Sequence, residues 1–360
     1  MSLADDGDPG REGQGSPSDR FLQELSPFKS VTLISHIHPD PDSLGSMVGL
    51  AHLVSRKLRI PTRLVRDGFI GRAENRVMVE CLGINLLPIE EVDWPADGAV
   101  VMVDSQPHTG RHSLPADVPI RAVIDHHETC GNLAGIPFVD VRSDVGATCT
   151  IVTSYLIEQQ VTIPKTVATA LFYGVESELT GYPREASSLD DGALLYLYPH
   201  AQKDLLARIR NAPLPHSYFE ALLQTLQNSF VYDKLILAWA GELPQPDLTA
   251  EIADLLIRFE EIEWSFCAGV YEDQFVMSLR SNNPRRQAGL LLQEVVGRLG
   301  KAGGHDRRAG GTIPLNSTSS SAVEQLRSTL RRRFLQALGI DECRGQRLVS
   351  RRELLQSLQA

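Results

Sequence analysis

The chain has 360 residues, of which 42% are hydrophobic and 22% charged, and a formal net charge of −10 at pH 7. This length is sufficient for two domains with separate cores. No apolar run approaches the roughly 20 residues that cross a bilayer, so we expect a protein that binds no membrane. The acidic balance disfavours tight binding of long nucleic acid but is compatible with a short anionic substrate. The cysteines are scattered and lack a CxxC pair, which disfavours a structural zinc site or a disulfide framework and predicts a cytoplasmic location.

The first residues of the chain, MSLADDGDPGREGQGSPSDR, are polar and rich in Gly, Pro and Asp. They lack the basic and then apolar composition of a signal peptide. Because they contain too few apolar side chains to offset the entropy of ordering, we expect residues 1–20 to be a disordered leader.

Three apolar, β-branched segments in the first half of the chain predict strands, at residues 30–35, 98–103 and 120–124. Helical apolar spacing occurs at residues 43–58 and 161–173. Short apolar strands that alternate with helices are typical of a parallel α/β sheet, whose ligands gather at the carboxyl ends of the strands. Each predicted strand runs into a polar cluster, so we expect the topology to bring these clusters together.

The second half predicts a smaller α/β domain. Residues 187–240 have a helical pattern, which ends before a break at Pro244-Gln245-Pro246-Asp247. The later expected elements are a helix at 249–259, two strands within 267–281, a helix at 288–299, a Gly-rich turn at 303–305, a strand at 311–314 and a C-terminal helix with Leu326, Leu330, Phe334 and Leu338 on one stripe. We therefore assign residues 21–240 to a first domain with a helical connection, and residues 241–360 to a second domain.

The polar clusters combine carboxylates with imidazoles. They contain His36, Asp40 and Asp42 after the first predicted strand, Asp104 after the second and Asp125-His126-His127 after the third. Gathered in one crevice, these groups would repel each other or lack partners without metal ions. Asp and His ligands without thiolate favour Mn²⁺, with cobalt, iron or magnesium as competitors. Two such ions about 3.5–4 Å apart are common in phosphoryl transfer, because they activate water and stabilise the developing charge.

These clusters resemble known motifs. HIHPDPDSLGS at 36–46, VVMVDS at 100–105 and VIDHH at 123–127 resemble motifs I, II and III of the DHH phosphoesterases, in that order. SLRS at 278–281 and AGGHDRRAGG at 302–311 are similar to the companion DHHA1 domain. The resemblance implies a parallel-sheet DHH domain with helices on both faces, plus a smaller α/β DHHA1 domain across a cleft.

The resemblance also implies a set of metal ligands. His36 and Asp40 would hold one ion, Asp42 and His126 would hold the other, and Asp104 would bridge both. Family members usually carry a further Asp in a G-I-x-x-D-T pattern, whereas this chain reads GVESEL from Gly174. Glu178 therefore stands at the position of that Asp. Glutamate is a competent oxygen ligand, so Glu178 is expected to complete the set, with Glu176 or water as the competing occupant.

Catalytic and substrate-binding roles follow from the same resemblance. His127 would lie near the bridging water and the substrate phosphate, and Asp125 would orient its neighbours, so His127, Asp104 and Asp125 are the implied catalytic residues. In the second domain, the substrate phosphate or a terminal nucleotide would be bound by Arg280, Gly303, Gly304 and His305.

The chain resembles the bacterial nanoRNA exonuclease and phosphoadenosine-phosphate phosphatase type within the RecJ-like superfamily. This implies a hydrolase with two Mn²⁺ ions, for which Mg²⁺ or Co²⁺ could substitute. Its substrate would be a short oligonucleotide or a small nucleotide such as 3′-phosphoadenosine 5′-phosphate, and a homodimer is compatible with the sequence. The alternatives are a cyclic dinucleotide phosphodiesterase and a degenerate nucleotide-binding regulator with impaired catalysis. Family II pyrophosphatases share the motifs of the first domain but differ in the second.

Overall fold

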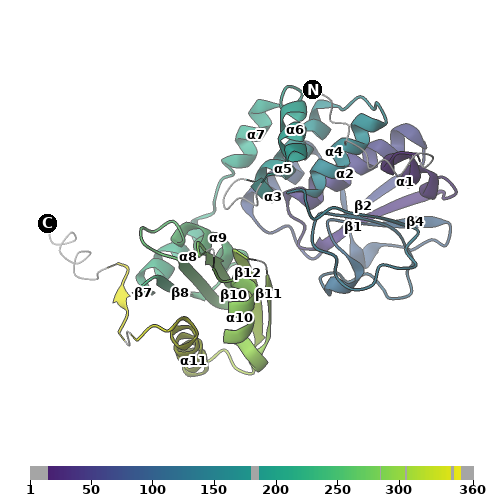
Figure 1. The fold of residues 1–360 in the computed structure, drawn as a ribbon. Helices are drawn as coiled ribbons and strands as arrows, with labels where there is room; N and C mark the ends of the chain where they lie inside the picture. Colours follow the sequence, from purple (N-terminus) through teal and green to yellow (C-terminus); the bar gives the residue numbers. More distant parts are fainter. Residues whose placement is uncertain (1–14, 180–185, 284, 305, 342–343, 350–360) are drawn as a thin grey trace. The chain divides into compact units, whose positions relative to one another are not determined.

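A computed structural model of the chain describes residues 15–179, 186–283, 285–304, 306–341 and 344–349 (Figure 1). The chain forms two compact units, Met1–Ala212 and Pro213–Ala360, each with its own sheet and hydrophobic core. None of the helices in the described ranges is both long and apolar enough to cross a bilayer.

The first unit is built on a parallel sheet with the strand order β3-β2-β1-β4-β5-β6. The strands are β1 (Ser30–Ile37), β2 (Thr62–Asp67), β3 (Leu86–Pro88), β4 (Gly98–Val103), β5 (Ile120–Asp125) and β6 (Phe138–Val141). The helices are α1 (Pro17–Leu25), α2 (Pro41–Lys57), α3 (Ala73–Leu82), α4 (Thr148–Glu158), α5 (Lys165–Leu179), α6 (Ser188–Leu197) and α7 (Lys203–Arg210), with 3-10 helices η1 (Ile89–Glu91) and η2 (Pro107–Thr109).

Both faces of this sheet are buried, which explains why its strands are continuous apolar runs. Successive side chains of a strand point to opposite faces, so Leu33 and Ile34 of β1 belong to two different hydrophobic clusters. The cluster around Leu33 contains side chains from helices α1 to α7. The cluster around Ile34 includes Ile89 of η1 and the loop residue Leu114. The α-helices therefore flank the sheet on the face of Leu33, and the 3-10 helix η1 with loop residues covers the face of Ile34. The fold is of the α/β class, as expected.

The strand order of the first sheet determines where a ligand can bind. From β1 the chain continues through β2 and β3 on one side, and β4, β5 and β6 follow on the other. In open parallel sheets, such a switch point lies at a crevice outside the carboxyl ends of the strands, where ligands bind. Strand β1 ends at Ile37, β4 at Val103 and β5 at Asp125. The three polar clusters lie at or directly after these strand ends, as predicted.

The N-terminal region differs from the predicted leader. Residues 1–14 lie outside the described residues, but Pro17–Leu25 forms helix α1. Ser16 and Asp19 form a reciprocal capping box that satisfies amide groups at the start of this helix. Phe21 and Leu25 are fully buried in the first core. The prediction of disorder through residue 20 was wrong because it counted polar residues and overlooked the cap.

The second unit contains a mixed sheet with the strand order β11-β12-β10-β9-β8-β7-β13, in which only β8 and β9 are parallel. The strands are β7 (Ser229–Tyr232), β8 (Leu235–Glu242), β9 (Trp264–Tyr271), β10 (Gln274–Ser281), β11 (Lys301–Gly304), β12 (Arg308–Pro314) and β13 (Gln346–Arg347). The helices are α8 (His216–Gln227), α9 (Leu248–Leu256), α10 (Ala288–Val296) and α11 (Ser320–Leu338), with the 3-10 helix η3 (Gly297–Leu299).

Helices cover both faces of the second sheet. Phe266 of β9 faces a core that includes Leu291 of α10 and Phe334 of α11. The preceding residue, Ser265, points to the other face, where its hydroxyl donates a hydrogen bond to the Ala253 carbonyl of α9 over 2.6 Å. The predicted strand pair around residues 272–273 and the C-terminal helix are both present.

The boundary between the units differs from the prediction. Residues 229–240, predicted to be helical, form the greater part of the β7–β8 hairpin. Their apolar, β-branched and aromatic side chains suit strands, and Asp233, with φ of 49°, lies in the turn. Because β8 pairs with β9, the predicted boundary at residue 240 lies inside the second sheet. The division lies instead between Ala212 and Pro213.

Candidate metal centre

The first donors come from strand β1 and the helix after it. His36 is buried near the end of β1. Asp40 is the N-cap of α2, and its Oδ1 accepts a hydrogen bond from the Ser43 amide over 3.0 Å. Asp42, in the first turn of α2, is 1% exposed. The beginning of one helix thus places two carboxylates at the carboxyl end of the sheet.

His36 and Asp40 meet Asp104, which directly follows β4. The Nε2 atom of His36 lies 3.6 Å from Asp40 Oδ2 and 3.6 Å from Asp104 Oδ2. Its Nδ1 atom lies 2.9 Å from the carbonyl of Ile37, so the tautomer with a proton on Nδ1 donates there and keeps the Nε2 lone pair for a cation. Burial alone lowers the pKa of His36, but hydrogen bonds and charges from Asp104 and Asp40 raise it to about 10. These three side chains form one candidate group of metal donors.

A second group of donors surrounds the other side of Asp104. The Nε2 atom of His126 lies 3.5 Å from Asp104 Oδ1 and 3.8 Å from Asp42 Oδ2. The Nδ1 atom of His127 lies 3.7 Å from Asp104 Oδ1. Asp104, His126 and His127 together form a candidate metal group, and Asp42 borders it. Asp104 therefore belongs to both groups.

The conformation of Asp104 suits a shared position. Its φ of 55° is in the left-handed region, which Asp tolerates better than most residues. Its Oδ2 accepts a hydrogen bond from the Ser43 hydroxyl over 2.7 Å, and its Oδ1 accepts one from the Thr148 hydroxyl over 3.0 Å. The same Oδ2 is the atom nearest His36, and Oδ1 is the atom nearest His126. The two hydroxyls thus direct one oxygen to each donor group.

Asp42 is held by the beginning of helix α4. The amides of Thr148 and Cys149 donate hydrogen bonds to its two carboxylate oxygens over 2.7 and 2.8 Å. The first amides of a helix have no partner within the helix and carry partial positive charge, so they favour an anion. Burial, followed by the charges of Asp104 and Glu178, nevertheless raises the pKa of Asp42 well above its usual value. A bound cation would offset this repulsion.

Asp125 orients the side chain of His127. Its Oδ1 lies 2.8 Å from His127 Nδ1, and its Oδ2 accepts a hydrogen bond from Gln106 Nε2 over 2.7 Å. Burial raises the pKa of Asp125, but the hydrogen bond and charge of His127, with the hydrogen bond from Gln106, outweigh it and lower the pKa to about 2. The His127 side chain is 25% exposed, whereas that of His126 is 2% exposed. His127 is therefore the histidine of this pair that a substrate can reach.

The donor set fits divalent metal ions. Two ligand atoms bound to one ion at about 2.1 Å can lie at most about 4.2 Å apart. The Nε2 atom of His36 lies 3.6 Å from a carboxylate oxygen of each of Asp40 and Asp104, and that of His126 lies 3.5 and 3.8 Å from oxygens of Asp104 and Asp42. These separations fall within that limit. Carboxylates and imidazoles without a thiolate suit Mn²⁺ and related ions, and their collection in a buried space is costly without a cation.

Glu178 lies in the last turn of α5 and is half-buried. Its charge contributes to the raised pKa of Asp42, which places its carboxylate in the neighbourhood of the donors. The competing candidate, Glu176, forms a two-pronged ion pair with Arg210 of α7 over 2.6 and 2.8 Å. A Cβ atom on Gly174 would lie 3.2 Å from the Cα of Asp42, so α5 packs closely on the donor region. The role of Glu178 as a ligand stays a prediction.

The predicted substrate residues of the second unit lie on neighbouring strands. Arg280 of β10 is buried, and its Nε donates a hydrogen bond to Asp254 of α9 over 2.5 Å. Gly303 and Gly304 end strand β11 and do not form the expected turn. A Cβ atom on Gly304 would lie 2.3 Å from the Arg308 carbonyl, whereas no atom lies within 4 Å of a Cβ on Gly303. His305 lies outside the described residues.

Three residues that support the donors were not predicted. Ser43 lies inside the first motif, but nothing in the sequence distinguishes its hydroxyl from those of other polar loop residues. Thr148 begins an apolar helix after a glycine and an alanine, a pattern that can mark a helix start and hence free amides. Gln106 had no recognisable signal, because its contact with Asp125 depends on the tertiary fold.

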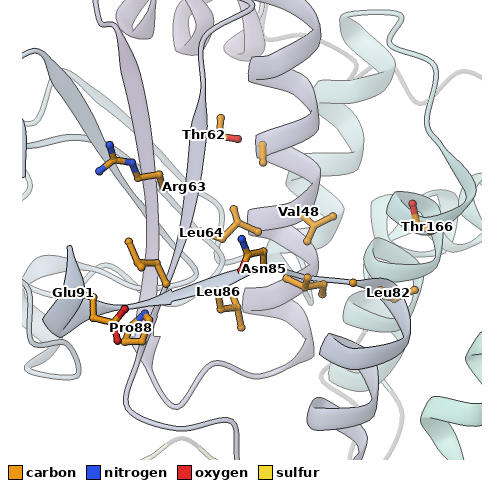
Figure 2. Close-up of a pocket in the computed structure, with 14 residues that line it drawn as sticks. Val48, Thr62, Arg63, Leu64, Leu82, Asn85, Leu86, Pro88, Glu91 and Thr166 are labelled. Carbon is orange, nitrogen blue, oxygen red and sulfur yellow. The ribbon is translucent and has the colours of Figure 1, made fainter. Parts of the chain in front are cut away.

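A groove of about 650 Å³ lies elsewhere in the first unit (Figure 2). It is lined by β2, β3 and parts of α2, and it includes the polar side chains of Arg63, Asn85 and Glu91. Thr62 and Arg63 begin strand β2, whereas the metal donors lie at the carboxyl ends of the strands. None of the donors lines this groove, so it is separate from the metal centre.

The chain is similar in sequence to a known domain family and to curated proteins. Residues 30–175 match the DHH family, N-terminal domain. An uncharacterized protein of Methanocaldococcus jannaschii is 32% identical over 319 residues, which cover 87% of this chain and 65% of that protein. A probable manganese-dependent inorganic pyrophosphatase of Streptococcus thermophilus is 27% identical over 152 residues, which cover 42% of this chain and 48% of that protein.

A solved structure shares the fold over most of the chain. An exopolyphosphatase-related protein from Bacteroides fragilis has a TM-score of 0.69 and 16% sequence identity, covering 89% of this chain and 97% of that chain. By length, this chain spans slightly less than two thirds of the archaeal relative and about half of the pyrophosphatase.

Proposed function

We propose that this chain is a manganese-dependent hydrolase of short oligonucleotides or of small nucleotide phosphates such as 3′-phosphoadenosine 5′-phosphate. The match of residues 30–175 to the DHH family, N-terminal domain, supports this proposal. The observation that carries the proposal is that Asp104, which is buried, belongs to two candidate groups of metal donors. One ion would be held by His36, Asp40 and Asp104. The second would be held by Asp42, His126 and Asp104, with Glu178 as the further candidate ligand.

Bound ions would lower the pKa of a coordinated water and neutralise charge on the phosphate oxygens. The protein supplies the fixed arrangement of donors around them. Ser43 and Thr148 orient the carboxylate of Asp104. The Nδ1–H group of His127 donates a hydrogen bond to Asp125, which leaves the Nε2 atom of this half-buried ring as the one that would contact a substrate phosphate. Such preorganised contacts stabilise developing charge without reorganisation during the reaction.

We assign recognition of the rest of the substrate to the second unit. Arg280 is the candidate partner of a phosphate, and Asp254 fixes its guanidinium. The open position beside Gly303 allows an anion to approach the backbone, and His305 would complete the set. The net charge of −10 supports a short substrate over a long nucleic acid.

Two other activities would use the same donors. Hydrolysis of a cyclic dinucleotide breaks the same kind of bond, and pyrophosphate hydrolysis is suggested by the name of the streptococcal relative. The presence of Glu178 where family members usually carry Asp favours a third alternative, a regulator that binds nucleotides without hydrolysing them. These alternatives differ in which compounds are hydrolysed, so a substrate panel separates them.

The test is hydrolysis by the purified full chain with Mn²⁺ or with excess chelator. The panel contains a dinucleotide, 3′-phosphoadenosine 5′-phosphate, a cyclic dinucleotide, inorganic pyrophosphate and a long single strand. The Asp104→Asn variant is the matched control, because Asn keeps the size of the side chain and also tolerates a left-handed backbone.

We expect Mn²⁺-dependent hydrolysis of the dinucleotide or of 3′-phosphoadenosine 5′-phosphate, and loss of that hydrolysis in Asp104→Asn. Faster hydrolysis of the cyclic dinucleotide or of pyrophosphate would replace the proposed substrate class. Binding of nucleotides without hydrolysis of any compound would favour the regulator.

A further inference from the structure

Asp190, in the first turn of α6, is fully buried and makes hydrogen bonds far outside its own helix. Its Oδ2 accepts a hydrogen bond from the amide of Gly146 over 2.8 Å, and its Oδ1 accepts one from the hydroxyl of Thr150 over 2.5 Å. The same Oδ2 accepts hydrogen bonds from the amide and the hydroxyl of Ser187 over 2.9 and 2.7 Å. One carboxylate therefore joins the start of α6 to the start of α4.

The segment that Asp190 holds is the segment that holds two metal donors. Between Gly146 and Thr150, the amides of Thr148 and Cys149 donate hydrogen bonds to Asp42. The hydroxyl of Thr148 donates a further bond to Asp104. Residues 146–150 are thus fixed on one side by Asp190 and turn their other polar groups to the metal centre.

The end of helix α5 meets the same point. A Cβ atom on Gly146 would lie 2.5 Å from the Cδ2 of Leu179 and 3.1 Å from the Oδ2 of Asp190. Leu179 directly follows Glu178, the candidate metal ligand. The contact of Gly146 with both side chains places the ends of three helices in one packed arrangement.

We propose that Asp190 is a positioning residue of the metal centre. It fixes the first turn of α4 so that this turn presents its amides to Asp42 and its hydroxyl to Asp104. Capping of α6 accounts for the bonds to Ser187 but not for those to Gly146 and Thr150. The inference rests on the proposed function only in that Asp42 and Asp104 are taken as metal ligands.

Asp140 of β6 provides a matched control in the same unit. Its side chain is 13% exposed and accepts hydrogen bonds from Arg142 over 2.9 and 2.8 Å. It also accepts a hydrogen bond from the hydroxyl of Tyr155 over 2.5 Å. Tyr155 lies in the second half of α4, so Asp140 anchors the same helix away from its first turn.

The experiment compares the full-length wild type with Asp190→Ala, Asp190→Asn and Asp140→Ala. Mn²⁺ affinity is measured by electron paramagnetic resonance of the free ion, and the midpoint of thermal unfolding is measured in parallel. Amide hydrogen exchange at Thr148 and Cys149 is measured on the metal-free proteins, so one readout requires neither metal nor activity.

We expect Asp190→Ala to weaken Mn²⁺ binding by about 10- to 100-fold, the usual effect of removing a group that orients metal ligands. The Mn²⁺ affinity of Asp190→Asn should lie between that of Asp190→Ala and that of the wild type, because Asn keeps one carbonyl oxygen as an acceptor. Asp140→Ala should lower the unfolding midpoint but retain the Mn²⁺ affinity. Exchange at Thr148 and Cys149 should accelerate on replacement of Asp190 and should stay at the wild-type rate in Asp140→Ala.

Wild-type affinity in Asp190→Ala, or an equal loss in Asp140→Ala, would overturn the inference. Should Asp190→Ala fail to fold, Asp190→Asn decides, since unchanged affinity in that variant contradicts the positioning role. Absence of Mn²⁺ binding by the wild type would refute the proposed function instead. The exchange rates then decide alone: accelerated exchange only on replacement of Asp190 supports the inference, and unchanged exchange overturns it.

Discussion

The hydroxyl of Thr148 donates a hydrogen bond to Oδ1 of Asp104 over 3.0 Å, and both side chains are buried. This bond connects the end of β4 with the first residue of α4. The amide of Thr148 also donates to Asp42, so one residue orients two of the candidate metal ligands. Their geometry therefore depends on a helix that lies outside the motifs that supply them.

Replacing Thr148 with Val should weaken metal binding while preserving the shape of the side chain. The variant loses the hydroxyl that aligns Asp104, so we expect Mn²⁺ affinity to fall by about 10-fold or more. Thr148→Ser keeps the hydroxyl, so its Mn²⁺ affinity should remain close to that of the wild type. Calorimetric titration with Mn²⁺ checks both variants. Equal affinity in Thr148→Val and the wild type would show that the hydrogen bond does not matter for the ion.

The proximity of the candidate donors was predictable from the sequence because each motif adjoins the end of a parallel strand. His36, Asp104 and His126 are close in space for that topological reason alone. The support from Thr148 and Asp190 was not predicted, since it arises from the packing of α4 and α6. The sequence before Thr148 can mark a helix start, but it does not show which carboxylates that helix start contacts. The β7–β8 hairpin was missed for another reason: a short apolar run has no periodicity that separates a buried strand from a buried helix.

The identity of residue 178 should control one metal position. If Glu178 is a ligand, its carboxylate should lie within about 2.0–2.6 Å of an ion in a metal-loaded crystal structure. Glu178→Asp should then preserve or raise activity, and Glu178→Ala should weaken the binding of one ion. Glu176→Ala is a suitable control, because that side chain is paired with Arg210. A structure with two ions and Glu178 remote from both would contradict this assignment.

Arg280→Ala and His305→Ala should impair substrate recognition without removing metal. Hydrogen bonds from charged groups to phosphate contribute about 1.5–3 kcal/mol each, so kcat/KM should fall about 10- to 150-fold. Asp254→Asn keeps the guanidinium of Arg280 but weakens the hydrogen bond that holds it, so it should lower kcat/KM by a smaller factor. Steady-state kinetics with 3′-phosphoadenosine 5′-phosphate and a count of bound Mn²⁺ test this division of roles. Loss of Mn²⁺ in either variant would refute it.

Helix α1 should contribute to the stability of the first unit. Phe21 is fully buried, so Phe21→Ala should lower the free energy of unfolding by about 3–5 kcal/mol. Phe219 of α8 is 55% exposed, and Phe219→Ala should change the free energy of unfolding by less than about 0.5 kcal/mol. Denaturant unfolding followed by circular dichroism measures both. Equal stability of the two variants would mean that α1 does not pack as described.

The central claim is that Asp104 is shared by two metal ions that together support hydrolysis. The most direct measurement is a Mn²⁺ titration of the metal-free wild type and of Asp104→Asn, with bound Mn²⁺ and hydrolysis of a dinucleotide recorded on the same samples. We predict two ions per chain in the wild type, activity that requires the second ion, and a loss of several orders of magnitude in Asp104→Asn, because both sites lose a ligand. Full hydrolysis in excess chelator, or two tightly bound ions and full activity in Asp104→Asn, would contradict the account.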